Sequence, residues 1–460
     1  MVIKRRIGIS SVLIITLLYC PTLFAGNLDS IEFNHEVKNS MANAVQAVCG
    51  KFVGNGISGE IELEDNESEL FFRCRQMVHS ANELAGIGPT GDSLSLTEDE
   101  LGEAMLDLAD EEIGVQGEWS TKTSNQQLAN IQTRFSDLHS GSGGISLSGL
   151  QIQGQDTVDL GEAFPTTVSS QAGGNAGDPF VKWGAFLTGI ITTGERDDTE
   201  RQPGYDLDST GITAGVDYRY NANFIAGMAA GYTSAEADLN NNGGSQDVDG
   251  YNLTLYGTYY RDMYYIDSSL SYGQYDYDSE RTVIYDSINA TPQASTEGEQ
   301  WNLYLAGGYS FYQNAWEYTP YAQLRYLDVD IDAYDEHGGA SPEINMSVAD
   351  QSISSFQTVL GGKVSYTSSM GWGVLIPYGR ADWHHEFKDE SRSLKYQYVY
   401  DPFNTTYSLN SEDPDKNFYT LGLGTSAVFK TGQAYFDFET PIDLDNVENY
   451  FFSIGGRMEF

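Results

Sequence analysis

Residues 449–460 read NYFFSIGGRMEF, and this alternating stretch decides the fold of the C-terminal part of the chain. Its even positions run from Tyr450 to Phe460 and are mostly apolar, whereas its odd positions include Ser453, Arg457 and Glu459. A period of two is the pattern of a β-strand with two different faces. We therefore expect one face of this strand to meet an apolar environment and the other to meet water.

The same alternation recurs through the C-terminal half, as in GITAGVDYRY (211–220), GYNLTLYGTYY (250–260), GRADWHHEF (379–387) and NFYTLGLGTSAVF (417–429). Short connections such as NANF take turns with long acidic ones such as LNNNGGSQDVDG. Short turns on one rim and long loops on the other are typical of an outer-membrane barrel. The alternating segments number twelve, near 180–193, 210–220, 225–237, 248–260, 263–278, 299–313, 317–330, 351–367, 372–387, 416–430, 433–440 and 449–460. The sequence thus predicts an all-β transmembrane barrel of about 12 antiparallel strands.

The tyrosines are concentrated in the C-terminal half, where the alternating segments lie. Of the 31 tyrosines, only Tyr19 precedes residue 200. Tyrosine and tryptophan rings favour the interfaces of a membrane, and no partner layer is evident for the apolar strand faces, so we expect lipid to cover them. The last strand should close the barrel against the first, because an open edge in hydrocarbon leaves amides unsatisfied. Gly456, Met458 and Phe460 then form the expected signal for the outer-membrane assembly machinery; the alternative is the edge strand of a soluble sheet.

The N-terminus has the pattern of a secretory signal peptide, residues 1–25. Basic residues precede an apolar run from Ile7 to Tyr19, and cleavage is expected after Ala25. A lipoprotein site at Cys20 is the alternative. Cys49 and Cys74 remain after cleavage, and an even count in an oxidising compartment predicts one disulfide, with two buried thiols as the other interpretation.

The first half is expected to be mostly α-helical. Residues 26–117 are predicted to form a small N-terminal domain, in which Thr97 and Glu100 have the spacing of a capping box. Residues 118–140 carry a narrow apolar stripe on a polar helix, which suits a wet surface or a polar tube, and we expect a helix inside the lumen. The Gly-, Ser- and Gln-rich segment 141–179 is predicted to be a linker to the barrel, residues 180–460.

The strongly negative net charge of the chain limits the kinds of molecule that it can bind. The formal net charge of −42 argues against binding nucleic acid or bare anionic membrane. We expect a monomeric barrel in contact with outer-membrane lipid and lipopolysaccharide; the ligand of the N-terminal domain cannot be read from the sequence.

Charged residues on the inward strand faces are the candidate functional groups. These residues would bind the lumen helix or determine which ions pass. The alternative is that they only keep a water-filled lumen polar. The predicted lumen charges are Asp217, Arg219, Arg325, Arg380, Asp382, His384, Arg457 and Glu459.

No catalytic, cofactor or metal residue is predicted. His384 and His385 are adjacent and would point to opposite faces of a strand, and the acidic run 328–332 is followed by Ala333 where a calcium loop needs glycine. GDSLSL (91–96) resembles the nucleophile block of GDSL esterases, with Ser93 as nucleophile, but a suitable His-Asp pair and a large α/β core are missing. We expect a turn there instead.

Residues 180–460 resemble the autotransporter β-domain family, in the blocks 211–260, TPYAQLRYLDVDIDAYDE, ADWHHEFKDESRSL, DPDKNFYTLGLGTSAVF and the terminal Phe460. The resemblance implies type V secretion, with a lumen helix that connects the barrel to a passenger outside the cell. The chain departs from the familiar pattern in its long linker and short helical passenger. The expected function is to anchor, export and display this N-terminal domain, with adhesion or another surface interaction as its expected role. The alternatives are a small solute pore with a periplasmic N-terminal domain, and a surface esterase.

Overall fold

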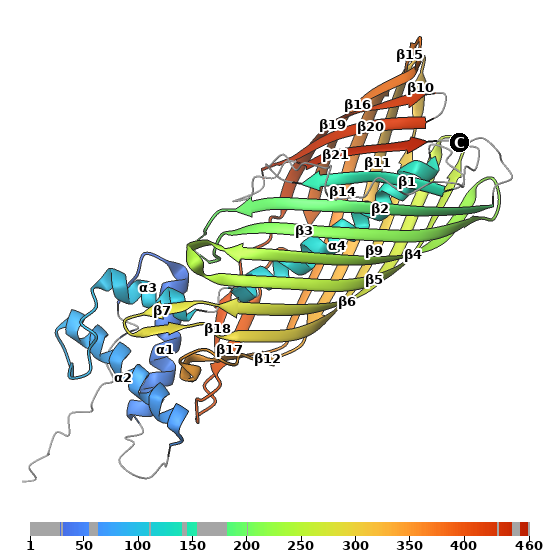
Figure 1. The fold of residues 1–460 in the computed structure, drawn as a ribbon. Coiled ribbons are helices and arrows are strands. Elements are labelled where there is room, and N and C mark those ends of the chain that lie inside the picture. Colours follow the sequence, from blue (N-terminus) through green and yellow to red (C-terminus); the bar gives the residue numbers. More distant parts are fainter. Residues whose placement is uncertain are drawn as a thin grey trace, which may run out of the picture.

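The computed structural model describes residues 28, 31–54, 63–109, 112–139, 145–153, 182–199, 201–429, 432–443 and 451–458. Figure 1 shows a long ring of strands around a helix, with further helices clustered at one end. The predicted signal peptide lies outside the described residues, as do residues 141–144 and 154–179 of the predicted linker.

Twelve long strands follow one another around the ring from Trp183 to Met458, which confirms the predicted strand pattern. Their bounds are β2 (Trp183–Arg196), β3 (Tyr205–Arg219), β4 (Phe224–Leu239), β5 (Gly244–Arg261), β6 (Tyr264–Arg281), β9 (Gln293–Tyr309), β11 (Trp316–Ile331), β14 (Gln351–Tyr366), β16 (Gly373–Glu386), β19 (Asn417–Phe429), β20 (Gly432–Ile442) and β21 (Phe451–Met458). Short strands β10 (Phe311–Gln313) and β15 (Ser368–Met370) extend the sheet beside the turns. Each long strand pairs antiparallel with the next one in the series.

The closure between the two ends of this series differs from the prediction. The last strand, β21, does not pair directly with β2; β1 (Ile145–Gln153) lies between them, antiparallel to β21 and parallel to β2. This strand falls inside the segment that we predicted to be linker. In its sequence ISLSGLQIQ, the apolar residues stand at odd positions before Ser148 and at even positions from Leu150 onward. The register to β2 shifts at the same place, between Ser148 and Gln151. Each run of alternating residues, on either side of Gly149, is only four residues long, which was too short to predict a strand.

The outward strand faces are apolar and exposed, as a lipid-facing wall requires. Leu253 and Leu255 on β5 are 50% and 56% exposed. Tyr251 and Tyr259 flank them on the same face, eight residues apart, which is about 27 Å along a strand. Tyr251 stands opposite Tyr232, and Tyr272 opposite Trp301, so the aromatic residues form rows across neighbouring strands. This arrangement matches the apolar band and aromatic girdle of outer-membrane barrels.

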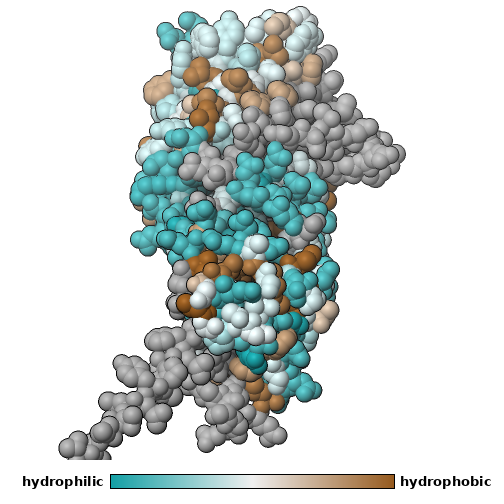
Figure 2. Space-filling view, turned by 90° about the vertical axis from the view of Figure 1, so that its left-hand side faces the viewer, coloured by the Kyte–Doolittle hydropathy of each residue, from teal (hydrophilic) through white to brown (hydrophobic). Residues whose placement is uncertain are grey.

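Beyond the aromatic row, the strands continue toward the long loops and their outward faces become acidic. One row across four strands consists of Asp208, Glu236, Asp247 and Asp278, each directly opposite the next and all exposed. Figure 2 shows the resulting hydrophilic zone across the middle of the molecule. Because like charges opposite each other destabilise a sheet, this part of the wall belongs in water or among lipid headgroups rather than in hydrocarbon.

Three helices form the N-terminal domain: α1 (Glu36–Gly54), α2 (Asp65–Ala85) and α3 (Glu98–Leu108). The predicted capping box is confirmed, since Glu100 N donates to Thr97 Oγ1 and Thr97 N donates to Glu100 Oε2. The predicted disulfide is also confirmed, with Cys49 of α1 bonded to Cys74 of α2. Both cysteines are buried in the core of this domain.

The long loops contain strands that the alternation pattern did not reveal. They form a hairpin, β7 (Val283–Tyr285) with β8 (Ile288–Ala290), and a sheet of β12 (Tyr334–Asp335), β13 (Met346–Val348), β17 (Ser393–Tyr398) and β18 (Tyr407–Asn410). The three helices pack on these loop strands and share one apolar core with them. Figure 1 shows α1 and α3 beside β7 and β18 at this end of the ring.

Within the described residues, none of the helices combines the length and hydropathy needed to cross a bilayer.

Candidate functional site

The candidate site is the lumen, which contains α4 (Glu112–His139). The helix begins six residues before the start that the sequence predicted. Its first turns lie beside residues of the long-loop end, such as Arg196 and Gln351, and its last residue lies beside Thr258 and Asp267 near the short turn between β5 and β6. The chain therefore runs through the ring from the loop end to the turn end (Figure 1).

At the loop end, polar side chains of α4 meet the upper parts of the strands. Glu118 accepts hydrogen bonds from Arg196 and from Gln202, the latter at 3.2 Å. The Ser120 hydroxyl lies 2.7 Å from the Tyr277 hydroxyl. Burial of these groups costs free energy unless they are paired, so the contacts fix the depth at which the helix enters.

In the middle of the lumen, α4 amides meet small hydroxyl residues of the wall. Gln126 Nε2 donates to Thr192 Oγ1 at 2.7 Å and to Ser209 Oγ at 2.8 Å. Gln127 Oε1 accepts from Thr213 Oγ1 at 2.6 Å. The wall residues Thr192, Ser209 and Thr213 are all buried. Inward threonines and serines thus form a surface that matches a glutamine- and asparagine-rich helix.

Near the turn end, an arginine and a histidine of α4 meet carboxylates. Arg134 donates to Asp217 Oδ2 through Nε at 2.8 Å and Nη2 at 2.6 Å, and Tyr256 Oη donates to the same oxygen at 2.9 Å. His139 Nε2 lies 3.0 Å from Asp267 Oδ1. These polar contacts hold the last two turns of the helix.

The apolar stripe of α4 also has a partner in the wall. Leu128, Ile131, Phe135 and Leu138 are buried in one cluster with wall residues, among them Phe186, Tyr256 and Tyr304. The Phe135 ring lies 5.9 Å from Tyr256 and 6.2 Å from Tyr304, centroid to centroid. The lumen is therefore matched to α4 in its apolar as well as its polar positions.

The opposite wall carries the predicted lumen charges of β11 and β16. Arg325 donates to Gln323 Oε1 at 2.7 Å, Tyr321 donates to Asp382, and Arg380 pairs with Glu439. His384 Nε2 lies 3.1 Å from Thr420 Oγ1. Among the described side chains, these four residues contact other residues of the wall, whereas Asp217 contacts α4.

The remaining predicted residues divide into two groups. Arg219 donates to the Tyr260 hydroxyl and lies over the Tyr260 ring. The side chains of Arg457 and Met458 in β21 and the surroundings of Gly456 are not described, and Glu459 and Phe460 lie outside the described residues. Their roles as lumen charges and as assembly signal stay predictions.

Sequence reasoning missed several lumen residues, among them Arg134, Asp267 and Lys363. Arg134 was not selected because the candidate charges were sought only on strands, although it is the one arginine on the predicted plug helix. Lys363 on β14 stands directly opposite Arg380 on β16, and its Nζ lies 4.2 Å from the centre of the Tyr378 ring. Its position in the alternation of β14 would have placed it inward.

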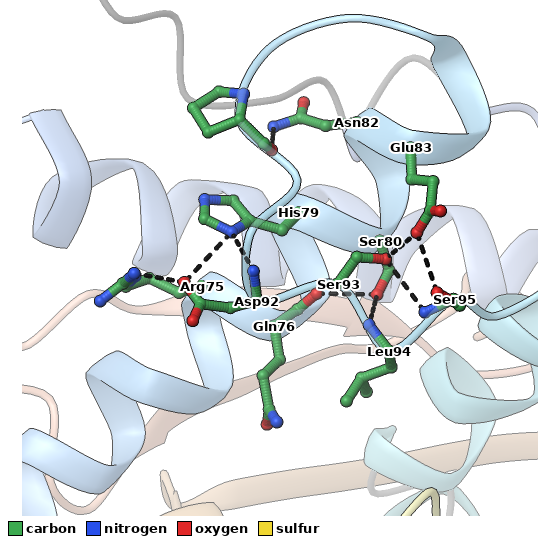
Figure 3. Close-up of polar contacts among 11 residues, drawn as sticks. Arg75, Gln76, His79, Ser80, Asn82, Glu83, Asp92, Ser93, Leu94 and Ser95 are labelled. Atoms are coloured by element: carbon green, nitrogen blue, oxygen red, sulfur yellow. Dashed lines mark hydrogen bonds and ion pairs between the residues drawn. The ribbon is translucent and has the colours of Figure 1, made fainter.

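The loop around Ser93 does not form a catalytic triad. Figure 3 shows Ser93 and Ser95 turned toward Glu83, with His79, Asp92 and Arg75 grouped separately. Ser93 Oγ donates to Glu83 Oε2, and His79 Nδ1 accepts from the Asp92 backbone N at 3.1 Å. Burial lowers the pKa of His79, Asp92 raises it and Arg75 lowers it. Within the described part of the chain, the hydrogen bonds of Ser93 join it to Glu83 and Ser95 and not to a histidine.

The loop is instead braced by polar side chains of α2. Asn82 Nδ2 donates to Pro89 O at 2.8 Å, and Leu94 N donates to Ser80 Oγ at 2.9 Å. These bonds support the turn that the sequence predicts. Across the described ranges, no group of three or more His, Cys, Asp or Glu side chains is placed to hold a metal ion.

An antiparallel barrel with short turns at one end, long loops at the other and a helix through its lumen is the architecture of an outer-membrane translocator. The autotransporter β-domain family model matches residues 185–439. The chain belongs to this family, and it is an integral outer-membrane protein of a Gram-negative bacterium.

The chain is similar to parts of several longer proteins with different names. The chain is 25% identical over 302 residues to outer membrane protein A of Rickettsia conorii, covering 62% of this chain and 14% of that protein. It is 23% identical over 249 residues to esterase EstA of Pseudomonas aeruginosa, covering 53% and 38%. It is also 23% identical over 231 residues to an extracellular serine protease of Serratia marcescens, covering 50% and 21%. The chain thus spans well under half the length of each of these relatives.

Solved structures include the translocator domain of the autotransporter NalP from Neisseria meningitidis, with 16% identity, a TM-score of 0.46 and coverage of 60% of this chain and 87% of that one. The β-domain of the Bordetella autotransporter BrkA has 20% identity and a TM-score of 0.42, covering 60% and 98%.

Proposed function

We propose that this chain displays its own N-terminal helical domain at the cell surface, with α4 as the tether through the barrel. The observation that carries the proposal is the direction of α4, which leads from the long-loop end to the short-turn end. Long loops of bacterial barrels are extracellular and short turns periplasmic. This direction supports a location outside the cell for the domain that precedes α4.

Three parts of the chain contribute to this function. The apolar outer wall, including Leu253 and Leu255, anchors the barrel in lipid. The lumen holds α4 through contacts such as Arg134 with Asp217. The helical domain with the loop strands presents the exposed surface. We assign to it a role in surface interaction rather than catalysis, because Ser93 donates to Glu83 and His79 is engaged with Asp92 instead.

Epitope labelling of intact cells tests the orientation. One epitope is inserted at the exposed turn of Gly86 and Gly88, a second at the loop glycines Gly338 and Gly339, and a third at the short turn 221–223. We expect antibody to label the first two on intact cells and the third only after the outer membrane is opened. Display is wrong if the loop epitope is labelled on intact cells while the 86–88 epitope is not.

A second candidate, conduction of small ions beside α4, is favoured by one observation. Arg380 and Glu439 point into the ring, yet their side chains are 30% and 27% exposed, so water reaches this wall. Lys363 and Arg380 stand directly opposite each other on it. Single-channel recording in planar bilayers tests this candidate: Lys363→Gln should shift the selectivity toward cations, and a silent bilayer with well-inserted protein retires it.

A further inference from the structure

The strands in the long loops pack one of their faces against the N-terminal helices. On β7, Val283 and Tyr285 are 0% and 6% exposed, whereas Ile284 between them is 52% exposed. On β17, Leu394, Tyr396 and Tyr398 are buried in the same way. Alternation of this kind shows a two-sided strand with one face in an apolar core. That core is the one that also contains α1, α2 and α3.

The helices and the loops complete each other's core. Buried helix residues include Val45, Met77 and Leu108, and the loop side contributes a comparable set. The loop residues in this core are Val283, Tyr285, Ile288, Ala290, Ile344, Met346, Val348, Leu394, Tyr396, Tyr398, Tyr407 and Leu409. Without the helices, these loops would expose a continuous apolar patch, which soluble surfaces rarely carry unless it binds something.

Polar contacts cross the same interface at several separate points. Arg73 Nε of α2 lies 3.1 Å from Glu343 Oε1, and Glu343 is buried. Lys51 Nζ of α1 donates to Thr405 Oγ1 at 3.0 Å. A buried carboxylate needs its cation, so the Arg73–Glu343 pair adds specificity to the apolar contact.

Arg281 joins the interface from the barrel side. It forms a buried ion pair with Glu336, at 2.7 Å between Nη2 and Oε2. The same guanidinium donates to the backbone oxygen of Asp107 at the end of α3, at 3.3 Å. The ion pair thus fixes the base of the loops and also contacts the helical domain.

The disulfide lies at this interface. Cys49 and Cys74 line a small cavity of about 20 Å³ together with Tyr285, Ile344 and Tyr398 from the loops. Since the disulfide joins α1 to α2, it holds together the two helices whose faces meet the loops.

We propose that the long loops form a binding site for the helical domain α1–α3, so that this domain is held as a non-covalent cap over the mouth of the barrel and does not depend on its peptide connection to α4. The site takes an amphipathic, disulfide-linked helical partner with an arginine opposite Glu343. The inference rests on the proposed function only for placing the cap outside the cell; the binding itself is measured in detergent and can fail separately.

Cutting the connection tests the proposal. A recognition site for a specific protease is inserted between Ala109 and Glu112 of the full chain, and the purified protein is cut in mild detergent. We expect the N-terminal fragment to co-elute with the barrel in size-exclusion chromatography. A fragment that separates from the barrel without denaturant overturns the proposal.

A matched pair of variants on β7 shows whether the named interface is responsible. Val283→Asp places a carboxylate in the shared core, and we expect the cut fragment to leave at least about a hundredfold faster. Ile284→Asp makes the same chemical change at the adjacent exposed position and should retain the fragment. Equal retention by the two variants contradicts the proposed interface.

Exchanging the charges of Arg73 and Glu343 distinguishes the loss of this ion pair from misfolding of a variant. Arg73→Glu alone should release the fragment, and Arg73→Glu with Glu343→Arg should restore retention, because the pair is re-formed in reverse. Gel mobility of the unheated and heated barrel checks its folding in each variant. Loss of retention in the double variant with a folded barrel counts against a specific pairing and overturns this part of the proposal.

Discussion

Arg134 of α4 and Asp217 of β3 form an ion pair inside the barrel, with 0% and 5% of their side chains exposed. Both guanidinium contacts converge on one carboxylate oxygen, which also accepts from Tyr256. The guanidinium carbon lies 5.3 Å from the centre of the Phe186 ring. The strand β2 offers Gly184 at this point, where a Cβ would collide with the Asp217 carboxylate. Wall and helix are thus adapted to each other at this pair.

Arg134→Met is expected to destabilise the helix in the lumen, because Asp217 would be left buried without its cation. The cost of breaking such a buried pair is about 3 kcal/mol or more. The midpoint of thermal unfolding in detergent, together with the protease sensitivity of α4, measures the change.

Two further variants separate the ion pair from a general loss of charge. Asp217→Asn combined with Arg134→Met should recover most of the lost stability. Arg219→Gln removes a lumen arginine that donates to the Tyr260 hydroxyl, a neutral group, and should cost much less. An Arg219→Gln protein as unstable as Arg134→Met would argue against this account of the pair.

The disulfide between Cys49 and Cys74 closes a loop with a sequence separation of 25. Replacing both cysteines by alanine should reduce the stability of the helical domain by about 3 kcal/mol, mainly because the unfolded chain gains freedom. Chemical denaturation followed by the near-ultraviolet signal of the domain measures this loss. Reductant should weaken the native protein and leave the double variant unchanged; a reductant effect of equal size on both would point to another cause.

The barrel could be predicted from the sequence because its strands are long and two-sided. Ile212 and Val216 face outward and Asp217 inward, as their parity predicts. The alternation arises from the physical difference between lipid and a wet lumen, and it persists over many residues in every strand. The disulfide followed from the compartment and the cysteine count alone.

The cap and the details of the lumen could not be predicted in the same way. Strands of three residues such as β7 give too little alternation to recognise, and their burial depends on a distant part of the chain. The partner of Arg134 was equally hidden, since nothing local to α4 specifies which of several inward carboxylates it meets. The closure through β1 depends on pairing between segments some three hundred residues apart, which local patterns do not encode.

Ser93 is expected to have no catalytic role. Its hydroxyl donates to the exposed Glu83 and accepts from Ser95 N at 3.0 Å, so it lacks the neighbouring histidine that activates a serine nucleophile. We expect hydrolysis of a short-chain nitrophenyl ester by the purified protein to stay at the level of the blank. Ser93→Ala should not change it, and ester hydrolysis that disappears in this variant would show that the domain is an enzyme after all.

Asp107 should make the stability of the cap depend on pH. Burial raises the pKa of its carboxyl group to about 6, against a smaller opposing effect of the hydrogen bond from Ile284 N, which lies 3.3 Å from Oδ2. Glu103 raises the pKa further, while Arg281 and Lys38 lower it. Because the pKa is higher in the folded domain than in the unfolded chain, the protonated form is favoured on folding. The stabilisation is complete below about pH 4 and is lost as the pH rises through 6.

The Asp107→Asn variant should therefore be more stable than the native protein at pH 7.5, by about 1 kcal/mol after allowance for partial solvent screening. At pH 5 the difference should shrink, because the native carboxyl group is then mostly protonated. Denaturant unfolding of the helical domain at the two pH values measures both differences. Asp99→Asn removes an exposed carboxylate from the same helix and should show no such change between the two pH values; a stability gain for Asp107→Asn that is equal at pH 5 and pH 7.5 would contradict the role of this carboxyl group.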